Sequence, residues 1–371
     1  MTVWAVALLL TQDRTAIKET LPNGATVYVG KLDTPGRVAV CVAASSIGRP
    51  ELPETHGVRH LVEHLMAKGD GSIDSTLEAV GATLTAETTR DTVSFSLSGP
   101  AGELQLLLNM AKTLFEVRTY TQADIEKEAR IVAEEMALLP YYFELAGAGW
   151  DRIYAKSELD PFGDPVKLGA MSPGTIELSQ KVAMNPKGLC LAVVGDLDTE
   201  TVYLRAKSMM ASFSTIDTEP FNRTRGEAPV LIGTDSGEGV GQPIDPFPKT
   251  QNLESLAAGL GIRAWTPGTD LVFTVSPRAG VMVVGSSGSW TRRTANALRG
   301  RESEVAVLGQ KILKTYLRSL QDDPSKLAKV TATVLPFFPS FDPMSLGGLG
   351  DGTDVDRVKA HVTSIVKVVS Q

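Results

Sequence analysis

The spacing of three histidines constrains the fold of this chain more than any other feature of its sequence. The chain has four histidines, and His56, His60 and His64 fall within nine residues. Apolar residues recur at helical spacing over residues 56–68, so this segment is predicted to be a helix. Positions four apart lie on one face of a helix. His60 and His64 are therefore expected to offer their imidazoles to the same ion.

A carboxylate borders the same face of this helix. Glu63 follows His60 by three residues and directly precedes His64, which gives the order His-x-x-Glu-His. This order is the zincin motif in reverse, the inverzincin signature. Zinc makes a bound water more acidic, and a carboxylate in this place can take the proton, so Glu63 is the candidate catalytic base. His56 precedes the expected helix start, where a structural or capping role is favoured over metal binding.

The two histidines need a third protein ligand, because a catalytic zinc usually has three protein ligands and one open position. An acidic helix is expected over residues 122–139. Its Glu128 and Glu135 are seven residues apart, nearly two turns, and so share a face. We take Glu135 as the third ligand and Glu128 as a neighbour that orients or tunes the site, with a surface carboxylate as the alternative for Glu128. Glu134 points away from that face and is expected to be solvated.

The length and patterning of the chain predict two parts. A chain of 371 residues is long for one core and more naturally forms two similar halves. We expect an α+β fold of two related halves, each a mixed sheet with helices on one face, the second half being shortened. The expected divisions are a signal segment or N-terminal extension (1–12), a zinc-binding catalytic half (13–214), a linker rich in Pro, Gly, Thr and Asp (215–251) and a non-catalytic half (252–371).

Strand and helix patterns fill both predicted halves. Alternating or continuously apolar runs predict strands, and apolar residues at helical spacing predict helices. The expected strands are 16–21, 26–29, 38–44, 92–98, 188–196, 270–275 and 280–284. Beyond those already named, the expected helices are 75–80, 103–114, 199–213, 253–260, 305–320 and 355–369.

Charge and apolar content narrow the partners and the location. The net charge of -7 argues against general attraction to nucleic acid or anionic lipid, so peptides, proteins or small molecules are the expected partners. Residues 3–10 are apolar but have no preceding Lys or Arg, so an export signal and a packed strand are both open. With a signal the protein is periplasmic or secreted, and otherwise cytoplasmic. No other stretch approaches the roughly 18 apolar residues of a membrane span. Cys41 and Cys190 lie in apolar runs and are expected to be buried thiols.

The sequence around the histidines resembles the pitrilysin/insulinase family, including the bacterial members similar to mitochondrial processing peptidase. Residues 57–65 look like the family's active-site helix, and residues 77–82 and 88–92 are similar to its peptide-pairing strand region. Residues 128–135 match the family's Glu-x6-Glu segment, in which the second Glu binds zinc. Residues 160–163 and 193–196 also resemble family stretches, so the resemblance covers about residues 15–213.

The resemblance implies a zinc-dependent endopeptidase that hydrolyses extended or unfolded peptides. It places Thr85 and Ala86 on the substrate-binding strand, where the family usually has Asn-Ala. The family's Arg and Tyr pair in the second half has no convincing match around residues 292–301. Because the family works as paired domains around a chamber, a homodimer or a heterodimer with a related subunit is expected. The alternative is a non-catalytic or partner-dependent subunit of a peptidase complex, acting as a binding or scaffold protein.

Overall fold

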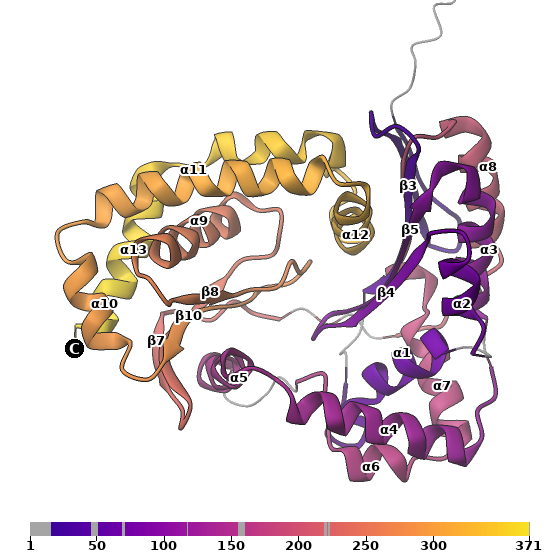
Figure 1. Cartoon of the computed structure of the whole chain (residues 1–371), viewed down its shortest axis with the longest axis horizontal. Coiled ribbons are helices and arrows are strands. Elements are labelled where there is room, and N and C mark those ends of the chain that lie inside the picture. Colours follow the sequence, from indigo (N-terminus) through magenta and orange to yellow (C-terminus); the bar gives the residue numbers. More distant parts are fainter. Residues whose placement is uncertain are drawn as a thin grey trace, which may run out of the picture.

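The protein is described by a computed structural model over residues 16–45, 51–68, 71–116, 118–154, 160–218, 221 and 223–370. The segment 1–12, considered above as a signal, lies outside these residues. Two sheets with their helices form the two parts of the molecule (Figure 1). Within the described ranges, no helix has the length and apolar character that crossing a membrane requires.

The first sheet has six strands in the order β1-β2-β6-β3-β5-β4. It is mixed, because β2 and β6 are parallel whereas the other neighbouring pairs are antiparallel. Its last strand, β4, forms an edge of the sheet as far as the chain is described. The five strands predicted for this part are confirmed, and the bounds are β1 (Ala16–Thr20), β2 (Thr26–Lys31), β3 (Arg37–Ser45), β4 (Thr83–Thr88), β5 (Thr92–Pro100) and β6 (Leu189–Gly195).

The central strand β3 shows how the two faces of this sheet are covered. Successive side chains of a strand point to opposite faces. Val38, Val40 and Val42 belong to the core beneath the helices of the first part, whereas Ala39, Cys41 and Ala43 belong to the core shared with the second part. The predicted buried thiols are confirmed, since Cys41 and Cys190 are both free and buried. The helices of the first part are α1 (Val58–Lys68), α2 (Ile73–Glu78), α3 (Leu104–Phe115), α4 (Gln122–Ala137), α6 (Pro165–Gly169), α7 (Pro173–Ala183) and α8 (Thr199–Met210).

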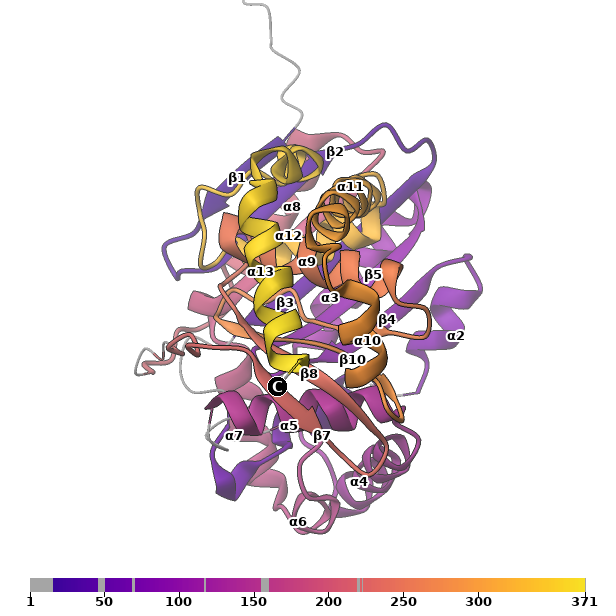
Figure 2. The ribbon, with the colours of Figure 1, turned by 90° about the vertical axis from the view of Figure 1, so that its left-hand side faces the viewer.

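The second sheet has four strands in the order β7-β8-β10-β9. Helix α9 packs against β10, and α11 and α13 pack against α9 (Figures 1 and 2). The predicted strands 270–275 and 280–284 are found, the first of them shorter. The strands are β7 (Val230–Gly233), β8 (Gly237–Ile244), β9 (Asp270–Val272) and β10 (Gly280–Ser287), and the helices are α9 (Thr250–Trp265), α10 (Thr291–Leu298), α11 (Glu302–Gln321) and α13 (Val355–Val369).

The structure confirms the α+β class and differs from the expected second part in two details. All pairs in the second sheet are antiparallel, so this sheet is not mixed. The stretch 215–251, expected to be a linker, contains β7 and the buried strand β8. Three glycines and one proline in β8 remove the apolar alternation by which a strand is recognised. One of them, Gly241, lies where a Cβ would come within 3.3 Å of the Gly149 Cα, so glycine allows the sheet and a crossing helix to approach.

Each part of the molecule supplies a helix to the other. Helix α5 (Tyr141–Tyr154) follows α4 in the chain but packs on the second sheet, where Leu145 joins a core with Ile232, Val281 and Val283. Helix α12 (Pro324–Val334) comes from the second part and packs on β3, β5 and β6 of the first sheet. Figure 1 shows both helices against the sheet of the opposite part. The expected placement of helices on one face of each sheet is therefore wrong for the first sheet, which has α12 on its second face.

Candidate metal centre

Helix α1, which carries the His-x-x-Glu-His residues, is held at its N-terminus by a buried carboxylate. Glu51 accepts hydrogen bonds from the backbone N–H groups of Gly57 at 2.9 Å and Arg59 at 3.4 Å. An acidic side chain is stabilising in this place because the first N–H groups of a helix have no partner within the helix. The side chain of Arg59 in turn lies 3.5 Å from Glu51 through its Nε. Both side chains are buried, so the start of α1 is fixed firmly relative to the core.

The stretch 160–163 packs against the start of α1 and against its first histidine. Gly57 and Gly163 both have positive φ, and a Cβ on Gly57 would come within 2.7 Å of the Gly163 Cα. The ring of Phe162 meets that of His60 edge to face, with 4.9 Å between centroids. The His56 Nε2 lies 2.7 Å from the backbone oxygen of Asp160, which fits the structural role expected of His56. This stretch therefore orients His60.

The two imidazoles of α1 face each other as the spacing predicts. The Nε2 atoms of His60 and His64 are 3.2 Å apart, and their side chains are only 9% and 12% exposed. Burial, together with the neighbouring His64 and Arg59, lowers the pKa of His60 to about 4. A neutral imidazole is the form that binds a metal ion. His60 is therefore in the metal-binding form over the whole neutral pH range.

Glu135 reaches the same point from helix α4. The buried residues Ile125, Ala129 and Val132 recur every three or four positions along α4, and Glu135 continues this stripe by one further step. Its Oε2 lies 3.5 Å from the Nε2 of His60 and 3.5 Å from the Nε2 of His64. The adjacent Glu134 is exposed, as expected. The structure thus brings together the three side chains proposed from the sequence as metal ligands.

The spacing of these three atoms fits a tetrahedral metal ion. Zinc bonds of about 2.0–2.1 Å in a tetrahedral arrangement place neighbouring ligand atoms about 3.3–3.4 Å apart. The triangle formed by His60 Nε2, His64 Nε2 and Glu135 Oε2 has sides of 3.2, 3.5 and 3.5 Å. Glu63 also lies within 4.8 Å of both imidazoles, but its Oε2 is 3.9 Å from the His60 Nε2. The tighter triangle makes Glu135 the better third ligand.

Glu63 lies beside this triangle as a buried carboxylate. Its side chain is 9% exposed and lines the same cavity as the histidines. The pKa of Glu63 is raised to about 7: burial raises it most, a hydrogen bond from Thr88 opposes the rise, and the nearby Glu135 contributes to it. The donor is the Thr88 hydroxyl, 3.2 Å from Oε2. A carboxylate with a pKa near neutrality can both accept and return a proton.

Glu128 lies behind His64, away from the open side of the triangle. Its Oε2 is 3.8 Å from the Nδ1 of His64, too far for a direct hydrogen bond. Its Oε1 is 3.2 Å from the Nζ of Lys68, which also contacts Asp124 at 3.3 Å. Glu128 is buried, so the solvated surface carboxylate considered as its alternative is wrong. The Glu128 carboxylate therefore lies between the Lys68 ammonium group and the His64 imidazole.

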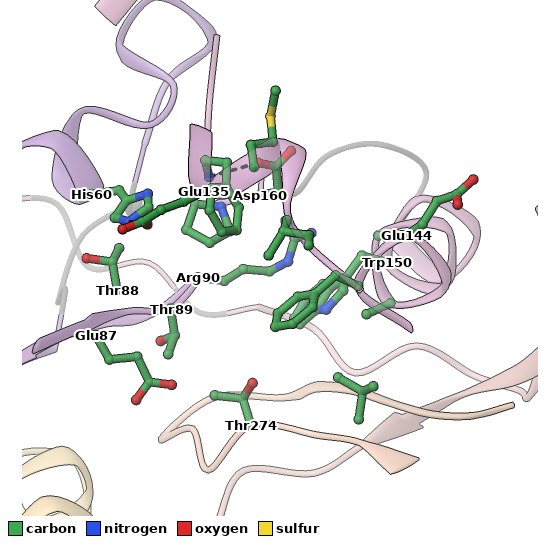
Figure 3. Close-up of a pocket in the computed structure, with 18 of the residues that line it drawn as sticks. His60, Glu87, Thr88, Thr89, Arg90, Glu135, Glu144, Trp150, Asp160 and Thr274 are labelled. Atoms are coloured by element: carbon green, nitrogen blue, oxygen red, sulfur yellow. Dashed lines mark hydrogen bonds and ion pairs between the residues drawn. The ribbon is translucent and has the colours of Figure 1, made fainter. Parts of the chain in front are cut away.

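The triangle opens into a cavity of about 750 Å³ between the two parts of the molecule. One wall is the end of β4, where Ala86, Glu87 and Thr88 line the cavity whereas Thr85 does not. The opposite wall combines Trp150 and other residues of α5 with Val272, Phe273 and Thr274 of the second part. Figure 3 shows Thr88 on the side of β4 that faces His60, Glu87 pointing the other way and Arg90 extending towards Trp150. The Arg90 guanidinium carbon lies 4.6 Å from the centre of the Trp150 ring.

Comparison with known protein families identifies the segment that builds this site. Residues 33–140 match the sequence profile of Insulinase (Peptidase family M16), and this range includes α1, β4 and Glu135. This segment of the chain is similar to the insulinase family. A search of curated protein sequences gave no match.

Solved structures of peptidases share the fold of this chain over nearly its whole length. A protease from Helicobacter pylori is 15% identical with a TM-score of 0.75, and the match covers 95% of this chain and 97% of that one. The first half of the periplasmic protease PqqL from Escherichia coli is 16% identical with a TM-score of 0.68, covering 96% and 91%. A peptidase M16 inactive domain from Pseudomonas fluorescens is 15% identical with a TM-score of 0.67, covering 93% of each chain. At these identities the likeness establishes the fold alone.

A buried ion-pair network next to the cavity was not expected from the sequence. Asp91 binds Arg223 through two contacts of 2.9 and 3.0 Å, Arg278 at 3.4 Å and the Ser276 hydroxyl at 2.5 Å. Asp91 follows β4, whereas the other three residues lie more than 130 positions later in the chain. No spacing rule relates such distant residues, so the sequence carried no signal for this network.

Proposed function

We propose that this protein is a zinc-dependent endopeptidase of the insulinase family that hydrolyses extended or unfolded peptides. The observation that carries the proposal is the triangle of two imidazoles and one carboxylate, whose side lengths fit a tetrahedral zinc ion, with a buried glutamate beside it. His60, His64 and Glu135 would hold the ion, and Glu128 would tune His64 through its Nδ1 side. When bound, zinc polarises the scissile carbonyl and makes water a better nucleophile.

Glu63 would carry out the proton transfers in this reaction. Its carboxylate accepts a proton from the attacking water and then passes that proton to the leaving amine. Both transfers occur beside the metal ligands, where the Glu63 Oε2 lies 3.9 Å from the His60 Nε2. The carboxylate is buried, and burial strengthens its interactions with developing charge.

The edge strand β4 supports a preference for extended peptides. An exposed strand edge offers backbone N–H and C=O groups that a further strand can pair with. Among the described strands, β4 pairs with β5 on one side only, and its end lines the cavity. We therefore propose that substrate adds to β4 as a strand, with Thr85 pairing through its backbone and Ala86 facing the cavity. A cavity of about 750 Å³ admits an extended segment but not a folded domain.

The quaternary arrangement is proposed from the fold. One structural relative is described as the first half of PqqL, so this fold occurs as one half of a longer chain. A homodimer, or a heterodimer with a related subunit, would supply the second half of such an arrangement. The rival function is a non-catalytic subunit that binds peptide, and another structural relative is described as an inactive domain.

Metal analysis tests the zinc site directly and uses two neighbouring glutamates as test and control. The wild-type protein is expected to hold one zinc per chain, measured by metal analysis and by competition with a chromogenic chelator. Glu135→Gln is expected to weaken zinc binding by at least about 100-fold, because loss of an outer-shell partner alone costs 10- to 100-fold. Glu134→Gln is the matched control, since Glu134 is exposed and outside the cavity lining. Equal zinc affinity in the two variants would rule out Glu135 as a ligand.

Peptide digestion separates the two functions once zinc binding is established. A quenched peptide library should be cleaved by the zinc-loaded chain, lose cleavage on chelation and regain it on zinc addition. A zinc-loaded chain without cleavage, alone and with any co-purifying subunit, would favour the non-catalytic subunit. Light scattering on the active fraction is expected to show a dimer, and an active monomer would contradict the proposed pairing.

A further inference from the structure

Thr88 connects the edge strand to the carboxylate of Glu63. Alternate residues of β4 point to opposite faces of the sheet, which places Thr88 on the face towards α1. Its hydroxyl donates a hydrogen bond to the Glu63 Oε2 at 3.2 Å. Figure 3 shows the Thr88 side chain on the His60 side of the strand. Thr83, near the start of the same strand, bonds instead to the Ser98 hydroxyl at 3.0 Å, away from the metal centre.

The backbone around Thr88 is fixed to the sheet and to helix α1. Thr88 pairs with Val93 at the end of the β4–β5 ladder, and the next residue, Thr89, donates its N–H to the Thr92 oxygen at 2.8 Å. Arg59 of α1 donates through its Nη2 to the backbone oxygens of Thr89 at 2.8 Å and Arg90 at 3.0 Å. Two sets of hydrogen bonds thus join α1 to this part of the chain. One is from Thr88 to Glu63, and the other is from Arg59 to the backbone oxygens of Thr89 and Arg90.

We propose that Thr88 is a positioning residue that holds the Glu63 carboxylate in its productive orientation and links that orientation to the strand on which substrate is proposed to bind. The inference rests on the proposed peptidase function. A glutamate has several rotatable bonds, and a donor on a rigid strand selects one orientation of the carboxylate. The β-branched side chain of threonine is itself restricted at χ1, so its hydroxyl is a well-placed donor. A peptide paired with β4 restrains the same strand.

Proton transfer depends steeply on this orientation. A misplacement of reacting groups by about 1 Å can lower a rate by about 100-fold. Loss of the Thr88 hydroxyl should therefore lower kcat, while zinc affinity, which depends on the three ligands, should not change. KM should also stay close to its original value, because the backbone of β4 is unaltered.

The experiment compares Thr88→Val, which replaces the hydroxyl by a methyl group of similar shape, with Thr88→Ser, which keeps a hydroxyl. In the full-length zinc-loaded protein, Thr88→Val is expected to lower kcat by about 10- to 100-fold, with KM within about twofold, because orientation rather than binding is lost. Because Thr88→Ser keeps the hydroxyl, its kcat is expected to stay within a few-fold of the wild-type value. Thr83→Val, on the same strand, is the control and should behave like wild type. Should Thr88→Val fail to fold, Thr88→Ala removes the same hydroxyl.

A second readout keeps this inference separate from the proposed function. Crystal structures of the metal-loaded wild type and Thr88→Val should show one orientation of the Glu63 carboxylate in the first and a changed or multiple orientation in the second. If the wild type cleaves no peptide, the proposed function fails, and these structures still decide whether Thr88 positions Glu63. An unchanged Glu63 together with an unchanged kcat in Thr88→Val would overturn the inference. Equal loss in Thr88→Ser and Thr88→Val would also overturn it, because the effect would then not depend on the hydroxyl.

Discussion

Replacing Glu63 by Gln is expected to leave zinc bound and to lower peptide cleavage by about 100- to 10,000-fold, the usual contribution of a general base. Gln has the same shape as Glu but cannot accept a proton at neutral pH. Glu63 also lies outside the tight triangle of donors, so the metal should remain in place. The loss should appear in kcat, since the variant still presents β4 to the substrate.

The measurement is kcat on a quenched peptide at saturating zinc, together with zinc content for each sample. Glu78→Gln is a suitable control, because Glu78 is an exposed glutamate at the end of α2 and does not line the cavity. Wild-type rates in Glu63→Gln would remove Glu63 as the base. A variant that loses zinc as well as activity would make Glu63 part of the metal-binding set instead.

Replacing Asp91 by Asn is expected to lower the free energy of unfolding by about 3–5 kcal/mol, the usual cost of removing one partner from a buried ion pair. Asp91 is the anion between Arg223 and Arg278, and all three side chains are at most 4% exposed. The guanidinium of Arg223 also lies 4.8 Å from the centre of the Trp150 ring, which shields it from water. Without Asp91, two buried cations lose the carboxylate that lies within 3.4 Å of both.

Chemical denaturation checks this prediction, with Glu304→Gln as the control. Glu304 pairs with Arg301 at 2.9 Å, but both side chains are at least half exposed, so its loss should change stability by no more than about 1 kcal/mol. The Asp91 network joins the end of β4 to the second part of the molecule, and its loss should separate the two walls of the cavity. Equal stability in the two variants would show that the buried pair contributes no more than a surface pair.

The same network has an expected pH dependence. Burial by itself would raise the pKa of Asp91, but the attraction of Arg223 and its hydrogen bonds, with help from Arg278 and Ser276, hold that pKa below the ordinary value of 3.8. A carboxyl group with a depressed pKa stabilises the fold above its unfolded-state pKa, and this contribution is lost as the pH falls through the folded-state pKa. Wild-type stability should therefore drop on acidification below about pH 4, and Asp91→Asn should lack this part of the drop.

The predictions from sequence succeeded where the physical cause was local. Helix α1 follows from apolar spacing, and the meeting of His60 with His64 follows from their separation by one turn. Helix α4 was likewise expected, and its buried side chains Ile125, Ala129 and Val132 lie three or four positions apart. The strands of the first sheet carry their own signal, which is alternation or, where both faces are buried as in β3, a continuously apolar run.

The predictions failed where a distant partner or a missing side chain decided the structure. Strand β8 lacks apolar alternation because it contains three glycines and a proline, and its glycines lie where β10 or Gly149 of α5 comes close. Helices α5 and α12 were not expected, and each is buried by the sheet of the opposite part. Thr88, Glu51 and Asp91 gained their roles from partners brought close by folding.

The sequence by itself determined which reactive groups are present: two imidazoles and a carboxylate on one helix turn, and an acidic helix further along the chain. It could do so because helix geometry fixes the relation of residues three or four apart. Only the tertiary structure decided that Glu135 comes within 3.5 Å of both imidazoles, that Thr88 reaches Glu63 and that helices of each part close the cavity from the other. These contacts join residues far apart in the chain, and their geometry depends on how two cores pack together, which no local pattern encodes.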